Sequence, residues 1–176
     1  MAAGAGLGAH PERTGGLVRL LVAASLIWPL ILTAAVWDRV ATGGSISSQA
    51  IYFACSRICH QRPERSFYTT GIKWPVCGRC SGLYLSAPVG AVAAMIARRR
   101  RRRPSPAESA NHRSDRRWLI LASLPTVVTF ALEWSGAPMT TLVRALAALP
   151  LGAAIAFVIV RIAAGRPKAI EYTGAR

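Results

Sequence analysis

Four long apolar runs dominate this sequence and limit the folds that the chain can adopt. They cover residues 17–37, 82–97, 118–134 and 142–164, and the charged side chains gather between them. A helix rises about 1.5 Å per residue, so about 20 apolar residues cross a hydrocarbon layer of about 30 Å. Hydrophobic residues make up 52% of the chain and charged residues 16%, which excludes a disordered chain and an ordinary soluble domain. The sequence predicts an all-α fold, a membrane bundle of four transmembrane helices with a small Cys-rich extracytoplasmic loop.

The loop between the second and third runs, residues 98–117, sets the expected orientation. It carries nine arginines against two acidic residues. Since short loops rich in Lys and Arg stay in the cytoplasm, this loop is predicted to be cytoplasmic. Four crossings then place both termini, residues 1–16 and 165–176, on the same side and leave residues 38–81 and 135–141 outside. The expected location is the bacterial cytoplasmic (inner) membrane, with a multi-pass topology.

The same loop begins with an unbroken basic run. Its members are Arg98, Arg99, Arg100, Arg101, Arg102 and Arg103. Basic side chains at a membrane surface attract anionic lipid headgroups with about 1 kcal/mol each, so the lipid bilayer and its anionic headgroups are expected partners. The alternative is that the run acts only as a topology determinant. Nucleic-acid binding is not predicted, because it requires a folded basic face that this sequence does not supply.

Two features of the runs predict how the helices meet. Glu133 and Arg144 flank the short outer loop, so they are expected to form an interfacial ion pair that offsets the cost of removing each charge from water. Small residues recur every four positions in the second and fourth runs, which predicts close packing of these two helices. They are Ser86, Gly90 and Ala94 in one run and Ala148, Gly152 and Ala156 in the other.

All four cysteines lie in the loop 38–81, as Cys55, Cys59, Cys77 and Cys80, and His60 follows the second of them. Two short thiol pairs brought together by a hairpin fit a tetrahedral zinc site, because thiolate and imidazole are the ligands that this ion favours. A helix over residues 47–60 would direct Cys55 and Cys59 to a common ion and give a four-cysteine shell. A less regular segment would let His60 replace Cys55. Cys59, Cys77 and Cys80 are ligands in both versions.

Thiol chemistry without a metal remains an alternative for the same cysteines. The outer side of a bacterial membrane is oxidising, so disulfides could join the first pair of cysteines to the second. Cys77 and Cys80 could also form a redox-active pair, with thiolates stabilised by Arg79 and by the amino end of the following helix. Covalent haem attachment is disfavoured, because three residues instead of two separate Cys55 from Cys59.

Two segments resemble the bacterial membrane proteins grouped as domain of unknown function 2085. They are Cys-His-Gln-Arg-Pro-Glu-Arg-Ser-Phe at 59–67 and Cys-Gly-Arg-Cys-Ser-Gly-Leu-Tyr at 77–84. Arg144 followed by Gly152 resembles a further feature of that family. The resemblance implies an integral membrane protein and supplies no activity. Because Cys55 is not part of the family pattern, the resemblance favours His60 as the fourth ligand.

These features predict a noncatalytic membrane protein. Its outer loop is expected to fold around a structural zinc ion and to serve the docking of a membrane-protein partner, the assembly of a homo-oligomer or the stability of a membrane complex. The alternative is a membrane thiol-disulfide oxidoreductase, or a disulfide-stapled loop, that uses Cys77 and Cys80. The sequence shows no serine, histidine and acid trio, no phosphate-binding loop and no pair of catalytic carboxylates, so catalytic residues are not predicted.

Overall fold

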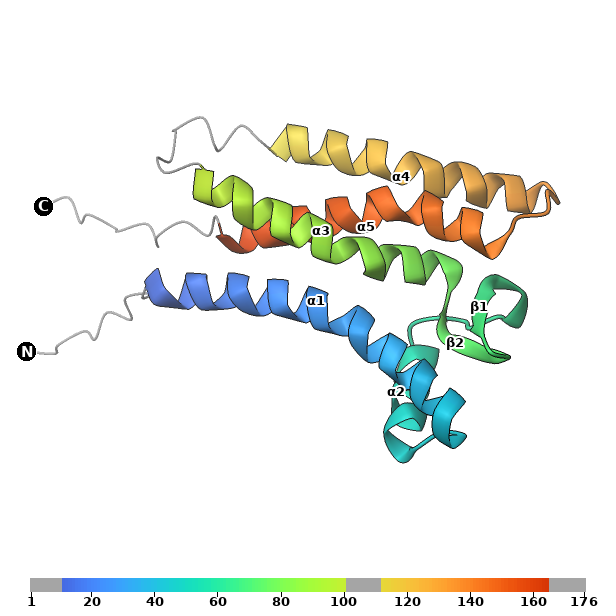
Figure 1. Cartoon of the computed structure of the whole chain (residues 1–176). Helices are drawn as coiled ribbons and strands as arrows, with labels where there is room; N and C mark the ends of the chain where they lie inside the picture. The colour runs from blue at the N-terminus through green and yellow to red at the C-terminus, as the bar shows by residue number, and fades with distance from the viewer. Residues whose placement is uncertain (1–10, 101–111, 165–176) are drawn as a thin grey trace, which may run out of the picture.

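The computed structural model describes residues 11–100 and 112–164. Its long helices are α1 (Pro11–Thr42), α3 (Gly78–Arg100), α4 (His112–Trp134) and α5 (Thr141–Ala164). A short helix α2 (Ile46–Ser56), a 3₁₀ turn η1 (Pro63–Arg65) and strands β1 (Ser66–Thr69) and β2 (Ile72–Cys77) connect α1 to α3. Figure 1 shows the long helices side by side, with α2 and the strands gathered at one end of the bundle.

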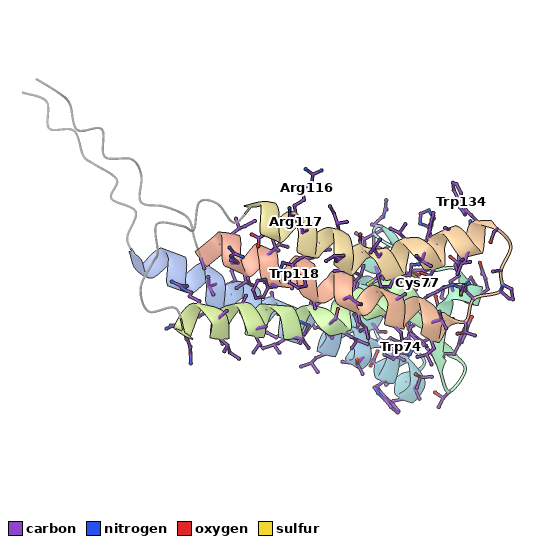
Figure 2. All side chains as sticks on the ribbon, turned by 90° about the horizontal axis from the view of Figure 1, so that it is seen from above. Trp74, Cys77, Arg116, Arg117, Trp118 and Trp134 are labelled. Atoms are coloured by element: carbon purple, nitrogen blue, oxygen red, sulfur yellow. The ribbon has the colours of Figure 1, made fainter. Side chains whose placement is uncertain are left out.

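Three of the long helices are long and apolar enough to cross a membrane. The candidate spans are Gly15–Thr42, Gly78–Arg99 and Thr141–Ala164, which match three of the four expected runs. Helix α4 forms where the other span was expected, but it is not among the candidates. Its first described turns are polar and basic, and Figure 2 shows Arg116, Arg117 and Trp118 near the start of α4 and Trp134 near its end.

Helices α3 and α5 pack in close contact, as the small residues predicted. A Cβ atom added to Gly82 would overlap the carbonyl group of Ala145, and one added to Gly90 would overlap that of Ala153. From the other side, Gly152 faces the backbone of Leu83. Glycine is required at these positions because the two backbones approach too closely for any side chain. The predicted packing of the second run on the fourth is confirmed.

The outer surface of the bundle is apolar. Large hydrophobic side chains project from it along all the long helices, among them Leu20 and Leu30 of α1, Leu121 and Val127 of α4, and Ile162 of α5. A soluble monomer seldom exposes so continuous an apolar surface, whereas lipid tails solvate it without cost. This surface is typical of a membrane-embedded bundle.

The segment between α1 and α3 contains a β-hairpin that the all-α prediction missed. Strands β1 and β2 pair antiparallel, and the turn residues Thr70 and Gly71 have φ angles of 48° and 81°. Two successive positive φ values give the tight turn whose twist matches a two-stranded ribbon. The Trp74 indole N–H donates to the Thr69 hydroxyl at 2.9 Å and ties the strands together. The hairpin returns the chain to Cys77, directly before α3.

Helix α2 is shorter than the helix expected over residues 47–60. It ends at Ser56, and Cys59 lies beyond it, in a turn in which its amide N–H donates to the carbonyl of Cys55 at 2.9 Å. Gln61 then takes a φ of 46°, which reverses the chain direction ahead of Pro63. Since the helix stops early, Ile58 turns outward instead of sharing the inner face with the cysteines.

Candidate metal centre

Three cysteines from separate segments meet where the hairpin joins α3. Cys59 follows α2, Cys77 ends β2, and Cys80 lies in the first turn of α3. Their sulfur atoms all lie within 4.8 Å of one another, which is close enough for a single metal ion to bind them. Within residues 11–100 and 112–164, these three make up the group of His, Cys, Asp and Glu side chains placed for a metal.

Backbone N–H groups near Cys77 point at the sulfur atoms of the cluster and stabilise negative charge on them. The Cys77 amide N–H donates to the Cys59 sulfur at 3.2 Å. The Cys80 thiol hydrogen-bonds to Cys77 and holds the pKa of the Cys77 thiol below its ordinary value, helped by the N–H groups of Cys80 and Arg79, although burial opposes the shift. Amide groups aimed at sulfur stabilise thiolates, which are the form that binds metal ions. The arrangement therefore favours a bound cation.

Gly78 fixes the turn between the two thiols of this motif. A Cβ atom at position 78 would overlap the backbone of Thr141, the first residue of α5. The motif Cys77-Gly78-Arg79-Cys80 therefore lies directly against α5, and its glycine is explained by that contact. The sequence suggested a tight turn here, but the contact with α5 depends on the tertiary fold.

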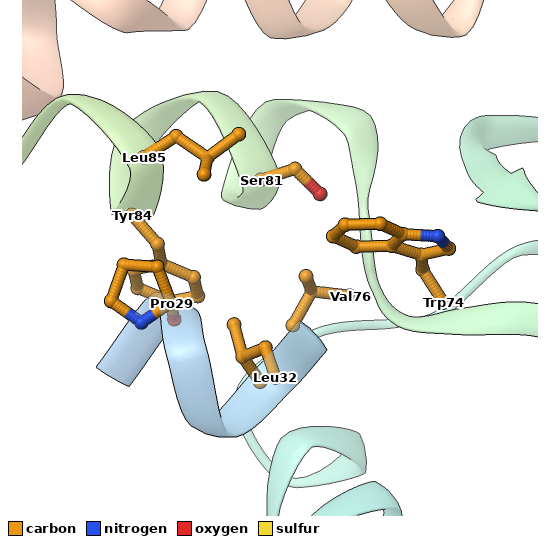
Figure 3. Close-up of a pocket in the computed structure, with 7 residues that line it drawn as sticks. All are labelled: Pro29, Leu32, Trp74, Val76, Ser81, Tyr84 and Leu85. Atoms are coloured by element: carbon orange, nitrogen blue, oxygen red, sulfur yellow. The ribbon is translucent and has the colours of Figure 1, made fainter. Parts of the chain in front are cut away.

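An apolar cluster surrounds the sulfur atoms. Its buried members are Leu32 of α1, Val76 of β2, Cys55 and Cys59, and Tyr84 and Trp28 pack against it with their rings edge to face at 6.0 Å. Figure 3 shows a small pocket beside the cluster. Its lining is almost wholly apolar and consists of Pro29, Leu32, Trp74, Val76, Ser81, Tyr84 and Leu85. Charged thiolates are costly in such surroundings unless a cation is bound to them.

The two candidates for a fourth ligand differ in position. Cys55 is fully buried in the same apolar cluster, and burial raises the pKa of its thiol, but its sulfur lies outside the group of three. His60 is exposed and also lies outside that group. The structure therefore brings Cys59, Cys77 and Cys80 together and leaves the fourth position to be assigned. All four cysteines are free thiols.

A buried ion network connects the motif to the other helices. The Glu133 carboxylate of α4 accepts a hydrogen bond from Arg144 of α5 at 2.5 Å, which is the expected pair, and a second one from Arg79 at 2.6 Å. The Glu133 side chain is only 7% exposed, and the Arg79 guanidinium also faces the Phe130 ring at 5.3 Å. Arg144 also donates to the carbonyl of Glu64 in η1 at 3.3 Å. The sequence offered no signal for Arg79 in this network beyond its position inside the motif.

The described part of the arginine run, residues 98–100, lies at the end of α3 that is opposite to the cysteines. Arg98 and Arg99 are exposed in the last turn of α3, and Arg100 ends that helix. Arg101, Arg102 and Arg103 lie outside the described residues. Lipid-headgroup binding by this run stays a prediction.

Comparison with known proteins agrees with the membrane character of the chain. The family model described as predicted membrane protein (DUF2085) matches residues 59–158. An uncharacterised protein of Methanocaldococcus jannaschii is 47% identical over 45 residues, and one of Methanothermobacter thermautotrophicus is 57% identical over 30 residues. These matches cover 26% and 17% of this chain and 29% and 27% of the relatives. No solved structure matches.

Proposed function

The chain belongs to the DUF2085 family of predicted membrane proteins, and we propose that it is a multi-pass membrane protein whose Cys59, Cys77 and Cys80 hold a structural zinc ion. The observation that carries the proposal is the convergence of these three sulfur atoms within 4.8 Å. The ion would fasten the hairpin to the end of α2 and to the start of α3. This noncatalytic role fits the absence of a catalytic constellation from the sequence.

The residues present fit zinc chemically. Sulfur ligands on a tetrahedral zinc ion with Zn–S bonds of about 2.3 Å lie about 3.8 Å apart, so a small adjustment of side-chain torsions brings the three sulfurs to that spacing. The Cys77 amide already donates to the Cys59 sulfur, as outer-shell groups around a structural metal do. A segment this short has little core of its own, so it gains most from a metal staple.

We assign the fourth ligand to Cys55. Its side chain is fully buried in the apolar cluster that contains Cys59 and packs against Cys77 and Cys80, whereas the side chain of His60 is exposed. A structural zinc site closes its shell with four protein ligands. The assignment departs from the family resemblance, which favours His60, and it rests on burial and proximity.

A thiol-disulfide oxidoreductase is the second candidate. The lowered pKa of Cys77 favours it, because a stabilised thiolate also serves redox chemistry. A redox reaction between Cys77 and Cys80 would not require the Cys59 sulfur, so it does not explain why that sulfur lies close to both. The structural zinc site accounts for all three cysteines and is therefore preferred.

We also propose that α4 is the fourth membrane span. Its side chains meet α5 at three levels: Asp115 with Arg161 at 2.6 Å, Thr126 with the Ala147 carbonyl at 2.9 Å, and Glu133 with Arg144. These contacts cover α5 from its end to its first turn, so α4 lies alongside a candidate span over most of its length. With four spans, the arginine-rich loop is cytoplasmic and the cysteines face the outside.

The metal content of the purified chain tests the proposal. We expect one zinc per chain by elemental mass spectrometry after purification in detergent under reducing conditions, and four alkylatable thiols after chelation. Cys59→Ser, Cys77→Ser and Cys80→Ser should each lose the zinc, and Ser56→Ala, an exposed neighbour, should keep it. A metal-free protein with a reducible disulfide would overturn the zinc site and support the oxidoreductase.

The fourth ligand is tested by a pair of variants. Cobalt substituted for zinc gives a sulfur-to-metal charge-transfer band whose intensity follows the number of thiolates. Cys55→Ser should weaken this band, whereas His60→Ala should leave it unchanged. The reverse pattern would assign the fourth position to His60 and leave the three-cysteine core of the proposal intact.

The fastened segment would serve the docking of a second membrane protein or of a second copy of this chain. We propose this role because a structural ion shapes a surface without performing chemistry. Native mass spectrometry of the detergent-purified protein, with and without chelation, tests it. Loss of an oligomer or of a co-purifying membrane protein on zinc removal is the expected result, and an assembly state independent of zinc would contradict it.

A further inference from the structure

We propose that α2 is embedded in the lipid layer, with Ile46, Phe53 and the following Ile58 in contact with phospholipid. The proposal concerns a surface away from the sulfur cluster and does not depend on a bound metal. The expected partner is the bilayer itself, in particular its anionic headgroups at the cysteine end of the bundle.

Contacts with α1 show that α2 runs back along the first span. At its start, the Asp38 carboxylate accepts hydrogen bonds from the amide and hydroxyl of Ser45 at 2.9 and 2.6 Å. In its middle, the Arg39 guanidinium lies 3.7 Å from the centre of the Tyr52 ring. Near its end, Cys55 packs in one cluster with Leu32. The start and middle of α2 thus meet Asp38 and Arg39 at the end of the span, and only the end of α2 reaches the deeper level of Leu32.

The level of Leu32 places the end of α2 within the membrane. Leu32 lies five residues before Trp37, whose exposed indole is typical of the membrane interface. At about 1.5 Å per residue, Leu32 is roughly 7 Å deeper than that indole. Leu30, at nearly the same level, is exposed on the lipid-facing surface of α1. The end of α2 therefore continues the apolar surface of the candidate span.

The outward face of α2 has an apolar stripe of Ile46, Ala50 and Phe53, which is flanked by the exposed polar residues Ser47, Gln49 and Ser56. No charged residue occurs in the helix, whose sequence is ISSQAIYFACS. Ile46 is 88% exposed and Phe53 is 62% exposed, two turns apart on one face, while Ser48, Tyr52 and Cys55 face inward. Ile58 extends the exposed stripe with 61% exposure. An uncharged helix that exposes large apolar side chains between small polar ones matches a helix lying at the membrane interface.

Arginines at and after the end of α2 supply positive charge that complements anionic phospholipid headgroups. The Arg57 guanidinium lies 4.7 Å from the centre of the Phe53 ring, one turn back toward the start of α2. Side chains lean toward the start of their helix, and here the start is the aqueous side, so Arg57 reaches from the apolar level toward the phosphates. Arg62, which is exposed, and Arg65, which is half-buried, follow in the chain, and each lies 4.0 Å from the Glu64 carboxylate. Together they fit anionic phospholipid.

Photo-crosslinking in liposomes tests the proposal. The full chain carries p-benzoyl-phenylalanine in place of Phe53 and is reconstituted into phosphatidylcholine with or without phosphatidylglycerol. Tyr68 of β1, which is 54% exposed and belongs to the hairpin, is the matched aromatic control. After irradiation, mass spectrometry should find severalfold more lipid adduct at position 53 than at position 68. Phosphatidylglycerol should exceed its share of the lipid in the adduct.

Further variants distinguish lipid contact itself from the preference for anionic lipid. Arg57→Gln should reduce the preference for phosphatidylglycerol and keep the lipid adduct itself. Replacing Ile58 with the same crosslinker should also give lipid adduct, which covers the case in which the Phe53 variant does not fold. Equal lipid adduct at positions 53 and 68, or adduct formed mainly with a second protein chain, would overturn the proposal in favour of an aqueous or protein-covered helix.

Discussion

Arg79 of α3 donates to Glu133 of α4 through its Nη2 atom at 2.6 Å. Arg79 lies between Cys77 and Cys80, so the helix that begins at the sulfur cluster is tied to α4 by an ion pair. The same carboxylate accepts from Arg144 of α5. One acidic side chain therefore ties together the starts of α3 and α5 and the end of α4, next to the candidate metal centre.

Removing this carboxylate should be costly. We expect Glu133→Gln to lower the free energy of unfolding by about 3–5 kcal/mol, because it leaves two largely buried arginines without their counter-ion. Glu64→Gln is the control: its carboxylate is 61% exposed and lies 4.0 Å from its arginine partners, so its loss should cost under about 1 kcal/mol. Thermal unfolding in detergent, followed by circular dichroism, measures both variants. Equal effects would contradict a structural role of the network.

Loss of a sulfur ligand should release the hairpin. Cys59→Ser is expected to abolish zinc binding and to lower the unfolding free energy of the segment by at least ~3 kcal/mol, because metal binding and folding are coupled. Chelation of the wild-type protein should produce the same change. Hydrogen exchange of the β1 and β2 amides provides the measurement, with the amides of α5 as an internal reference. Unchanged hydrogen exchange in the hairpin would contradict its stabilisation by a zinc ion.

The close approach of α3 and α5 predicts a strict requirement for glycine. We expect Gly90→Ala to cost about 1–3 kcal/mol, because the added methyl group overlaps the Ala153 backbone and the helices must separate. Gly16→Ala in α1 is the matched control, since nothing lies within 4 Å of the added atom there. That change should be neutral or slightly stabilising in a helix. Thermal unfolding in the same detergent compares them.

A hydrogen bond joins α2 to the hairpin beside their apolar contact. The Tyr52 hydroxyl donates to the Lys73 carbonyl at 2.6 Å, so Tyr52→Phe should destabilise the segment by about 1 kcal/mol. Tyr68→Phe removes an exposed hydroxyl and should have no measurable effect. Hydrogen exchange of the hairpin amides reads out both changes. A neutral Tyr52→Phe variant would show that α2 is held by apolar contacts alone.

The orientation can be tested with reporters. Alkaline phosphatase fused after Gly136, in the turn between α4 and α5, should be active, since that turn is predicted to face the outside. A fusion after Ser105, in the arginine-rich loop, should be inactive. The opposite pattern would reverse the topology and remove the oxidising environment on which the disulfide alternative depends.

The sequence predicted the helices and the cysteine cluster from local signals. Apolar runs of sufficient length specify α1, α3 and α5, and the small-residue spacing indicated that α3 meets α5. The pairing of Glu133 with Arg144 was expected because the two residues flank one short turn. Each of these features depends on residues close in sequence or on a simple period.

The missed features depend on tertiary contacts. The strands β1 and β2 are too short for alternation to reveal, and β2 packs against α1, α2 and α3, which are contacts that the sequence does not show. The position of Arg79 between Glu133 and Phe130 follows from the fold of three helices. Cys55 and His60 were both candidates on spacing; Cys55 lies on the inner face of α2 and is buried against Leu32 and Val76, whereas His60 lies beyond the end of the helix and is exposed.

The hydrogen bond from Arg144 to the Glu64 carbonyl restrains the segment that connects Cys59 to Cys77. Glu64 lies within that segment, closer to Cys59 than to Cys77, so the segment is held at its ends by the sulfur cluster and at Glu64 by a side chain of α5. The sulfur cluster and the Arg144 hydrogen bond thus restrain the same segment at different points. Loss of either contact alone leaves the other in place, and the segment should open fully only when both are lost.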